Sequence, residues 1–167
     1  MKKLTLLFSL VFVCMAASIA LAQDQKQKDR DMLIKAARFL EAKPLDKDAK
    51  GIRGWAVGFV IETDQVSVVV CGGDLMQPLL EKKNKNSTEL IGQYTIGMAA
   101  FKLENPDKKD DENSAQLAGI ESALKAYEAI IAEKPKTRFP AMDDLIVKRD
   151  KGELKALVEA ANCTGKK

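Results

Sequence analysis

The chain has 167 residues, of which 46% are hydrophobic and 31% are charged, and its formal net charge is +3. So small a charge gives no electrostatic footprint for nucleic acid, which proteins bind through clustered Lys and Arg. The absence of histidine excludes Ser–His and Cys–His catalysis and the zinc and haem sites that use imidazole. No carboxylate, lysine or tyrosine pair stands out as catalytic, so we predict a non-enzyme with no cofactor and no metal.

Residues 1–22 have the three parts of a secretory signal peptide. Met1-Lys2-Lys3 is basic, residues 4–21 are apolar, and Ala20-Leu21-Ala22 precedes an abruptly polar run. We expect cleavage after Ala22 and a periplasmic or secreted bacterial protein. The alternative is a retained membrane anchor, because the apolar run approaches the ~20 residues that span a bilayer. No later run approaches that length, so we expect no membrane association after cleavage.

Helical spacing of apolar residues predicts one all-α domain over residues 23–167, made of six or seven short helices without a substantial sheet. A charged connector, residues 105–114, divides it. The expected helices lie within residues 24–42, 46–60, 74–80, 87–104, 117–133, 142–149 and 154–161.

Two segments near the middle of the chain are less regular. Gly51, Gly54 and Gly58 are spaced so that they share one helix face, and we expect another helix to approach closely there, since glycine weakens a helix by roughly 1 kcal/mol. Residues 66–70, VSVVV, have strong β propensity but no second strand to pair with. We predict either an extended link or a first helical turn.

Cys71 and Cys163 are the two cysteines that remain after cleavage, because Cys14 lies in the apolar run. In an oxidising compartment an even pair favours a disulfide. Two free, buried thiols are the alternative. Nothing near Cys71 in the sequence would activate it as a nucleophile.

Two acidic stretches could suggest calcium. Residues 46–51, DKDAKG, imitate the start of a calcium loop, but Lys50 occupies the fifth position and Val57 replaces the final glutamate. The carboxylates of residues 107–112 are interleaved with lysines, which is typical of a solvated loop before a helix. We predict no metal site at either place.

Part of the chain resembles a tetratricopeptide-type helical hairpin. Ala123, Tyr127 and Pro135 in SALKAYEAIIAEKP resemble its second helix, and Ile96-Gly97 in QYTIGMAAFKL resembles its first. A long connector separates the two helices, and no tandem copy follows. The resemblance implies a partner-binding groove, whose residues would be Gln93, Tyr94, Lys125 and Glu128.

These observations favour an exported helical protein that acts as a protein-interaction module, with another envelope protein as its partner. The chain as a whole resembles exported bacterial helical proteins, which implies no activity. One alternative is a small-ligand carrier or an enzyme with a pocket between helices, lined by Trp55 or Tyr127. Another is an envelope-stress or toxin-neutralising protein.

Overall fold

The computed structural model describes residues 23–163, and the predicted signal peptide lies outside them. The chain divides after Met32, and the compact unit that begins at Leu33 carries the features described below. The described part is helical without strands, which confirms the predicted fold class. Its seven α-helices are residues 23–42, α2 (Ala49–Glu62), α3 (Gln77–Leu80), α4 (Ser87–Glu104), α5 (Glu112–Glu133), α6 (Pro140–Asp150) and α7 (Leu154–Ala161).

The predicted charged connector is shorter than expected. It ends at Asp111, because the Asp111 side chain accepts a hydrogen bond from the main-chain N–H of Ser114 at 3.0 Å and caps α5. Helix α5 therefore begins at Glu112, inside the stretch that the sequence assigned to the connector. Within residues 23–163, no helix is long and apolar enough to cross a membrane.

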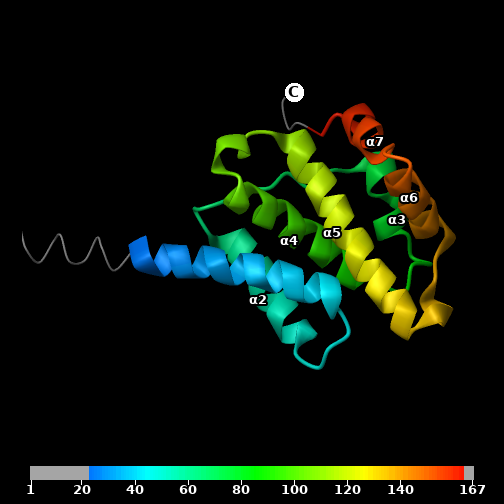
Figure 1. Ribbon diagram of the computed structural model, residues 1–167, viewed down its shortest axis with the longest axis horizontal. Helices are drawn as coiled ribbons and strands as arrows, with labels where there is room; N and C mark the ends of the chain where they lie inside the picture. Colours follow the sequence, from blue (N-terminus) through cyan, green and yellow to red (C-terminus); the bar gives the residue numbers. More distant parts are fainter. Residues whose placement is uncertain (1–22, 164–167) are drawn as a thin grey trace, which may run out of the picture. The chain divides into compact units, whose positions relative to one another are not determined.

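Helices α4 and α5 pack along each other at the centre of the compact unit (Figure 1). Helix α2 packs against α4, while α6 and α7 pack against α5. Helix α4 therefore contributes to two hydrophobic clusters. The first cluster is built on α4, α5, α6 and α7 and includes Tyr94, Met98, Leu124 and Tyr127. The second cluster joins residues 33–42, α2 and α4 and includes Leu40, Ala56, Ile96 and Ala100.

The close helix approach lies between α4 and α5, and not on α2 as the sequence suggested. A Cβ atom on Gly97 would stand 2.5 Å from the Cβ of Ser122, and one on Gly119 would stand 2.7 Å from the Cγ of Met98. Both positions therefore need glycine. The expectation for α2 was wrong, because a Cβ on Gly51, Gly54 or Gly58 would meet nothing within 4 Å.

Candidate functional site

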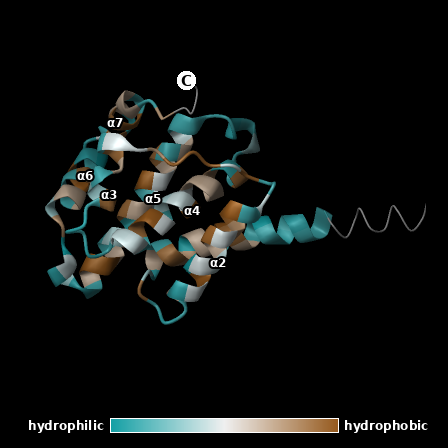
Figure 2. Ribbon diagram, turned by 180° about the vertical axis from the view of Figure 1, so that it is seen from behind, coloured by the Kyte–Doolittle hydropathy of each residue, from teal (hydrophilic) through white to brown (hydrophobic). Residues whose placement is uncertain are grey.

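Residues 63–72 link α2 to the short 3-10 turn Gly73–Leu75 that precedes α3, and they contain neither helix nor strand. Residues 66–70 within them form a link and not a helical turn, which is one of the two alternatives predicted for that run. Figure 2 shows it as a coil with hydrophobic residues that crosses the compact unit. Its β-branched residues favour an extended backbone, and the side chain of Val68 packs against both hydrophobic clusters. The segment forms no sheet with any described residue. It is therefore an isolated strand-like element on a helical scaffold.

Side chains of the two central helices hold this segment through its carbonyl groups. The Nζ of Lys102 donates to the carbonyl oxygen of Ser67 at 2.9 Å, and the side-chain amide of Gln116 donates to the carbonyl oxygen of Val69. Along an extended chain, successive main-chain groups point to opposite sides. Ser67 and Val69 direct their carbonyls towards α4 and α5, so this alternation would direct the main-chain groups of Val66, Val68 and Val70 to the other side.

That other side is an unused hydrogen-bonding edge. Within the described part of the chain, no main-chain N–H of residues 66–70 donates a hydrogen bond. The side chain of Val70 adds apolar surface, with 52% of the residue exposed. An unpaired strand edge of this kind is a template for pairing with another chain. We refer to residues 66–70 as the open edge.

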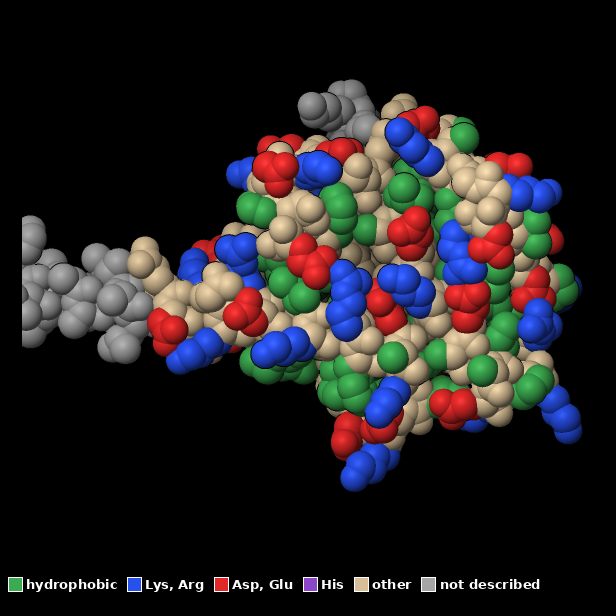
Figure 3. Space-filling model, viewed as in Figure 1, with side chains coloured by type: hydrophobic (Ala, Val, Ile, Leu, Met, Phe, Trp, Pro, Cys, Tyr) green, Lys and Arg blue, Asp and Glu red, His purple; other side chains and the backbone are tan. Residues whose placement is uncertain are grey.

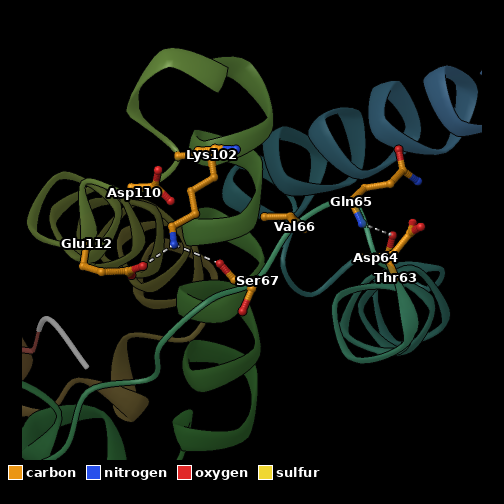
Figure 4. Close-up of a pocket in the computed structure, with 9 residues that line it drawn as sticks. Thr63, Asp64, Gln65, Val66, Ser67, Lys102, Asp110 and Glu112 are labelled. Atoms are coloured by element: carbon orange, nitrogen blue, oxygen red, sulfur yellow. Dashed lines mark hydrogen bonds and ion pairs between the residues drawn. The ribbon is translucent and has the colours of Figure 1, made fainter. Parts of the chain in front are cut away.

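A polar cavity of about 520 Å³ opens beside the first half of the segment (Figure 4). Lys102 lines this cavity, and its Nζ is 2.6 Å from Oε1 of Glu112. The Lys102 side chain is only 4% exposed, so this ion pair is largely removed from water. The other oxygen of Glu112, Oε2, is buried and has no partner among the described residues. Because this oxygen is buried, a donor that entered the cavity could reach it only after a rearrangement. Its lining residues are Thr63, Asp64, Gln65, Val66, Ser67, Lys102, Lys109, Asp110 and Glu112.

The far end of the segment is fixed by Cys71. The structure places Cys71 and Cys163 at disulfide distance, with their Cα atoms 5.4 Å apart, as the sequence predicted. Beneath this end, the hydroxyl of Tyr94 contacts the side-chain carbonyl of Gln116. Burial raises the pKa of Tyr94 to about 12, partly offset by a hydrogen bond to the backbone of Cys71. The open edge is thus held at several points along its length.

The four residues of the expected partner groove do not form one surface. Gln93 is buried, and its side-chain amide donates to the carbonyl oxygen of Ala37 at 3.1 Å and to Ser122 Oγ at 2.7 Å. The same Ser122 hydroxyl donates to Glu41 Oε1 at 2.7 Å, and Lys125 lies 3.4 Å from Glu41 Oε2. Gln93 and Lys125 therefore belong to one polar cluster between helices, in which only Lys125 is exposed.

The other two residues of that set lie elsewhere. Tyr94 is fully buried in the first cluster. Glu128 accepts two hydrogen bonds from Arg149, at 2.7 and 2.8 Å, and joins α5 to α6. These bonds raise the pKa of Arg149. Gln93 and Tyr94 could therefore meet a partner only after a rearrangement, whereas Lys125 and Glu128 lie at the surface in ion pairs.

The sequence reasoning missed Lys102, Glu112 and Gln116, which shape the site. A usable signal was the spacing of Tyr94, Met98 and Lys102, which places them on the same face of a helix. Trp55 and Tyr127, named as lining residues for a small-ligand pocket, line neither this cavity nor the one between α2 and α4. No group of three or more potential ligands within residues 23–163 could hold a metal ion.

The surface around the compact unit carries both signs of charge. Figure 3 shows Lys and Arg interspersed with Asp and Glu over the face that it presents. No protein-family model matches the chain, and no curated protein or solved structure is significantly similar to it. The open edge and the cavities are therefore the features of the molecule that bear on its function.

Proposed function

We propose that the protein is an exported interaction module that binds an extended segment of another envelope protein along its open edge. The observation that carries the proposal is the unused row of main-chain N–H groups at residues 66–70. A partner strand would pair with Val66, Val68 and Val70, in the mode known as strand addition. Main-chain pairing would supply affinity, and apolar contact with the exposed Val70 side chain would add to it.

The anchoring of the segment supports this proposal on energetic grounds. A strand that must be ordered upon binding loses conformational entropy of about 1–2 kcal/mol per residue. Here the hydrogen bonds from Lys102 and Gln116 hold the carbonyls of Ser67 and Val69, and the Cys71–Cys163 link holds the end. A preorganised edge avoids most of that loss. Each main-chain hydrogen bond to the partner would then contribute about 0.5–1.5 kcal/mol.

The test is a photo-crosslinking residue at position 70, used in the native cell envelope with proline variants of the segment. Val68→Pro removes an outward N–H, whereas Ser67→Pro removes one that points towards the helices. Val68→Ala controls for lost packing. We expect Val68→Pro to reduce the crosslinked product about tenfold or more, with both controls within about twofold of the wild type. A product that survives Val68→Pro unchanged contradicts strand addition.

Hydrogen exchange gives an independent readout once a partner has been captured. The amides of Val66, Val68 and Val70 should exchange rapidly in the free protein and slowly in the complex, because pairing would engage their N–H groups. Rapid exchange of all three amides in a saturated complex would place the contact elsewhere on the protein.

We further propose that the chain is exported with cleavage after Ala22. The cysteine pair at disulfide distance suits an oxidising compartment, in addition to the signal-peptide pattern of residues 1–22. Intact mass of protein purified from the envelope should correspond to a chain that begins at Gln23. Alkylation should label Cys71 and Cys163 only after reduction. A mass that retains residues 1–22, or labelling without reductant, contradicts this part of the proposal.

A further inference from the structure

A second cavity, of about 680 Å³, lies between α2, α4 and the turn that precedes α2. Its volume is within the range of small-molecule sites, about 300–1,000 Å³. It shares no lining residue with the polar cavity beside the open edge. We call it the Arg53 groove. Much of its wall is apolar and comes from Pro44, Leu45, Ala49, Val57 and Ile91.

Arg53 brings a positive charge into this groove and forms no salt bridge with Asp46 or Glu89, the two carboxylates that line it. Its Nη2 donates to the carbonyl oxygen of Pro44 at 3.0 Å. Its Nε is buried and unpartnered, and no described carboxylate forms a salt bridge with it. The Nη1 group donates no hydrogen bond within the described residues. The guanidinium is therefore only partly satisfied by the protein itself.

The packing around Arg53 holds its side chain in place. A Cβ atom on Gly92 of α4 would stand 2.9 Å from Cδ of Arg53 and 3.2 Å from its Cγ. The stem of the arginine thus occupies space that a larger residue at position 92 would need. Burial lowers the pKa of Arg53, and the negative charge of Glu89 opposes this effect from a distance. Burying a charge costs free energy unless it is paired, so an anionic ligand would find a prepared partner.

We propose that the Arg53 groove binds a small organic acid, with its carboxylate on the Arg53 guanidinium and its apolar chain along Val57 and Ile91. A carboxylate accepts charge-assisted hydrogen bonds from guanidinium, which are stronger than neutral ones. An apolar body suits the wall described above, since removing apolar surface from water contributes roughly 25 cal/mol per Å². This site is separate from the open edge and does not depend on strand addition.

The probes are butanoate, hexanoate and octanoate, with hexanol as the uncharged counterpart of hexanoate. Binding is measured by calorimetry on the purified protein and by chemical-shift changes of the Gly54 and Gly92 amides. We expect affinity to rise with chain length, hexanol to bind at least about tenfold more weakly than hexanoate, and both glycine amides to shift. No binding of any of the three acids, or equal binding of hexanol, overturns the proposal.

Three substitutions separate the charge effect from general damage. Arg53→Gln should weaken hexanoate binding about tenfold or more, while Glu89→Gln should strengthen it, because a competing negative charge at the groove is removed. Arg138→Gln, at an exposed ion pair with Asp143, is the matched control and should leave affinity within about twofold. Unchanged binding in Arg53→Gln overturns the proposal. If that variant does not fold, weaker binding in Glu89→Gln or shifts that map away from Gly54 and Gly92 in the wild type overturn it instead.

Discussion

The two hydrophobic clusters meet on α4 but are closed in different ways. The first cluster contains large side chains such as Tyr94, Met98 and Leu124, and the Cys71–Cys163 link closes it. The second cluster is rich in alanine, with Ala56 and Ala100 among its members, and Glu41 and Gln93 contribute polar contacts beside it. The first cluster therefore depends on covalent closure and tight packing, whereas the second tolerates open glycine positions on α2.

Removing the Cys71–Cys163 link should lower the free energy of unfolding more than any other change proposed below. A ring with a sequence separation of 92 residues contributes about 3–5 kcal/mol in the chain-entropy account. Cys163→Ser should lower the free energy of unfolding by that amount in urea titrations. Ala160→Ser, at an exposed position of α7 shortly before Cys163, is the control. Reductant should bring the wild type to the level of Cys163→Ser; a wild type insensitive to reductant argues against the link.

A side chain added where α4 and α5 cross should cause the second-largest loss of stability. The Cβ of Gly119→Ala would stand 2.7 Å from Met98 Cγ and 2.9 Å from the carbonyl oxygen of Tyr94, and the latter belongs to a rigid backbone. Overpacking of this kind costs about 1–3 kcal/mol, and we expect the upper end of that range in thermal or chemical unfolding. A change below about 0.5 kcal/mol would mean that the helices separate readily, and that the first cluster is no more tightly packed than the second.

The pH dependence of stability tests the burial of Tyr94. Its pKa is about 12 in the folded protein and about 10 when unfolded. Above pH 10 the unfolded chain releases this proton while the folded chain keeps it, so stability is present below pH 10 and is lost as pH rises towards 12. The loss should be on the order of 2 kcal/mol. Tyr94→Phe should show a correspondingly smaller fall over the same range; identical slopes contradict the assignment.

The smallest effect is expected at Gly54 of α2, which lines the open Arg53 groove. Gly54→Ala adds a methyl group that meets nothing within 4 Å, and alanine stabilises a helix by about 1 kcal/mol relative to glycine. The free energy of unfolding should therefore rise slightly, opposite in sign to Gly119→Ala. A loss of stability in Gly54→Ala would indicate that α2 has a packed neighbour on this face and would erase the difference between the two regions.

The helices were predictable because their apolar residues repeat at helical spacing, and the cysteine pairing followed from having two cysteines to join. The spacing of apolar residues does not predict which helix faces pack against each other. Gly54 and Gly97 are both glycines within helices, yet only the position of Ser122 across the crossing makes Gly97 necessary. The polar side chain of Gln93 likewise suggested a surface position. In the structure it is buried, because it donates hydrogen bonds to Ala37 and Ser122.

The site was harder to foresee for a related reason. Residues 66–70 were correctly expected to lack a partner strand, but nothing in that run specifies what holds it. Lys102 and Glu112 come from different helices and meet at 2.6 Å only after α4 and α5 have packed. The Arg53 groove similarly needs α2 to lie against α4, so that Gly92 makes room for the arginine.

The link between Cys71 and Cys163 also has a topological consequence. It closes a loop that contains α3 to α7, whereas residues 33–42 and α2 lie outside the loop. A protease that cuts once in the exposed residues 106–111 would leave both pieces covalently joined, with the open edge still attached to α5–α7. A single cut between α2 and Cys71 would release the N-terminal piece. A single cut between Cys71 and Cys163 therefore leaves one covalent molecule, whereas a single cut before Cys71 gives two.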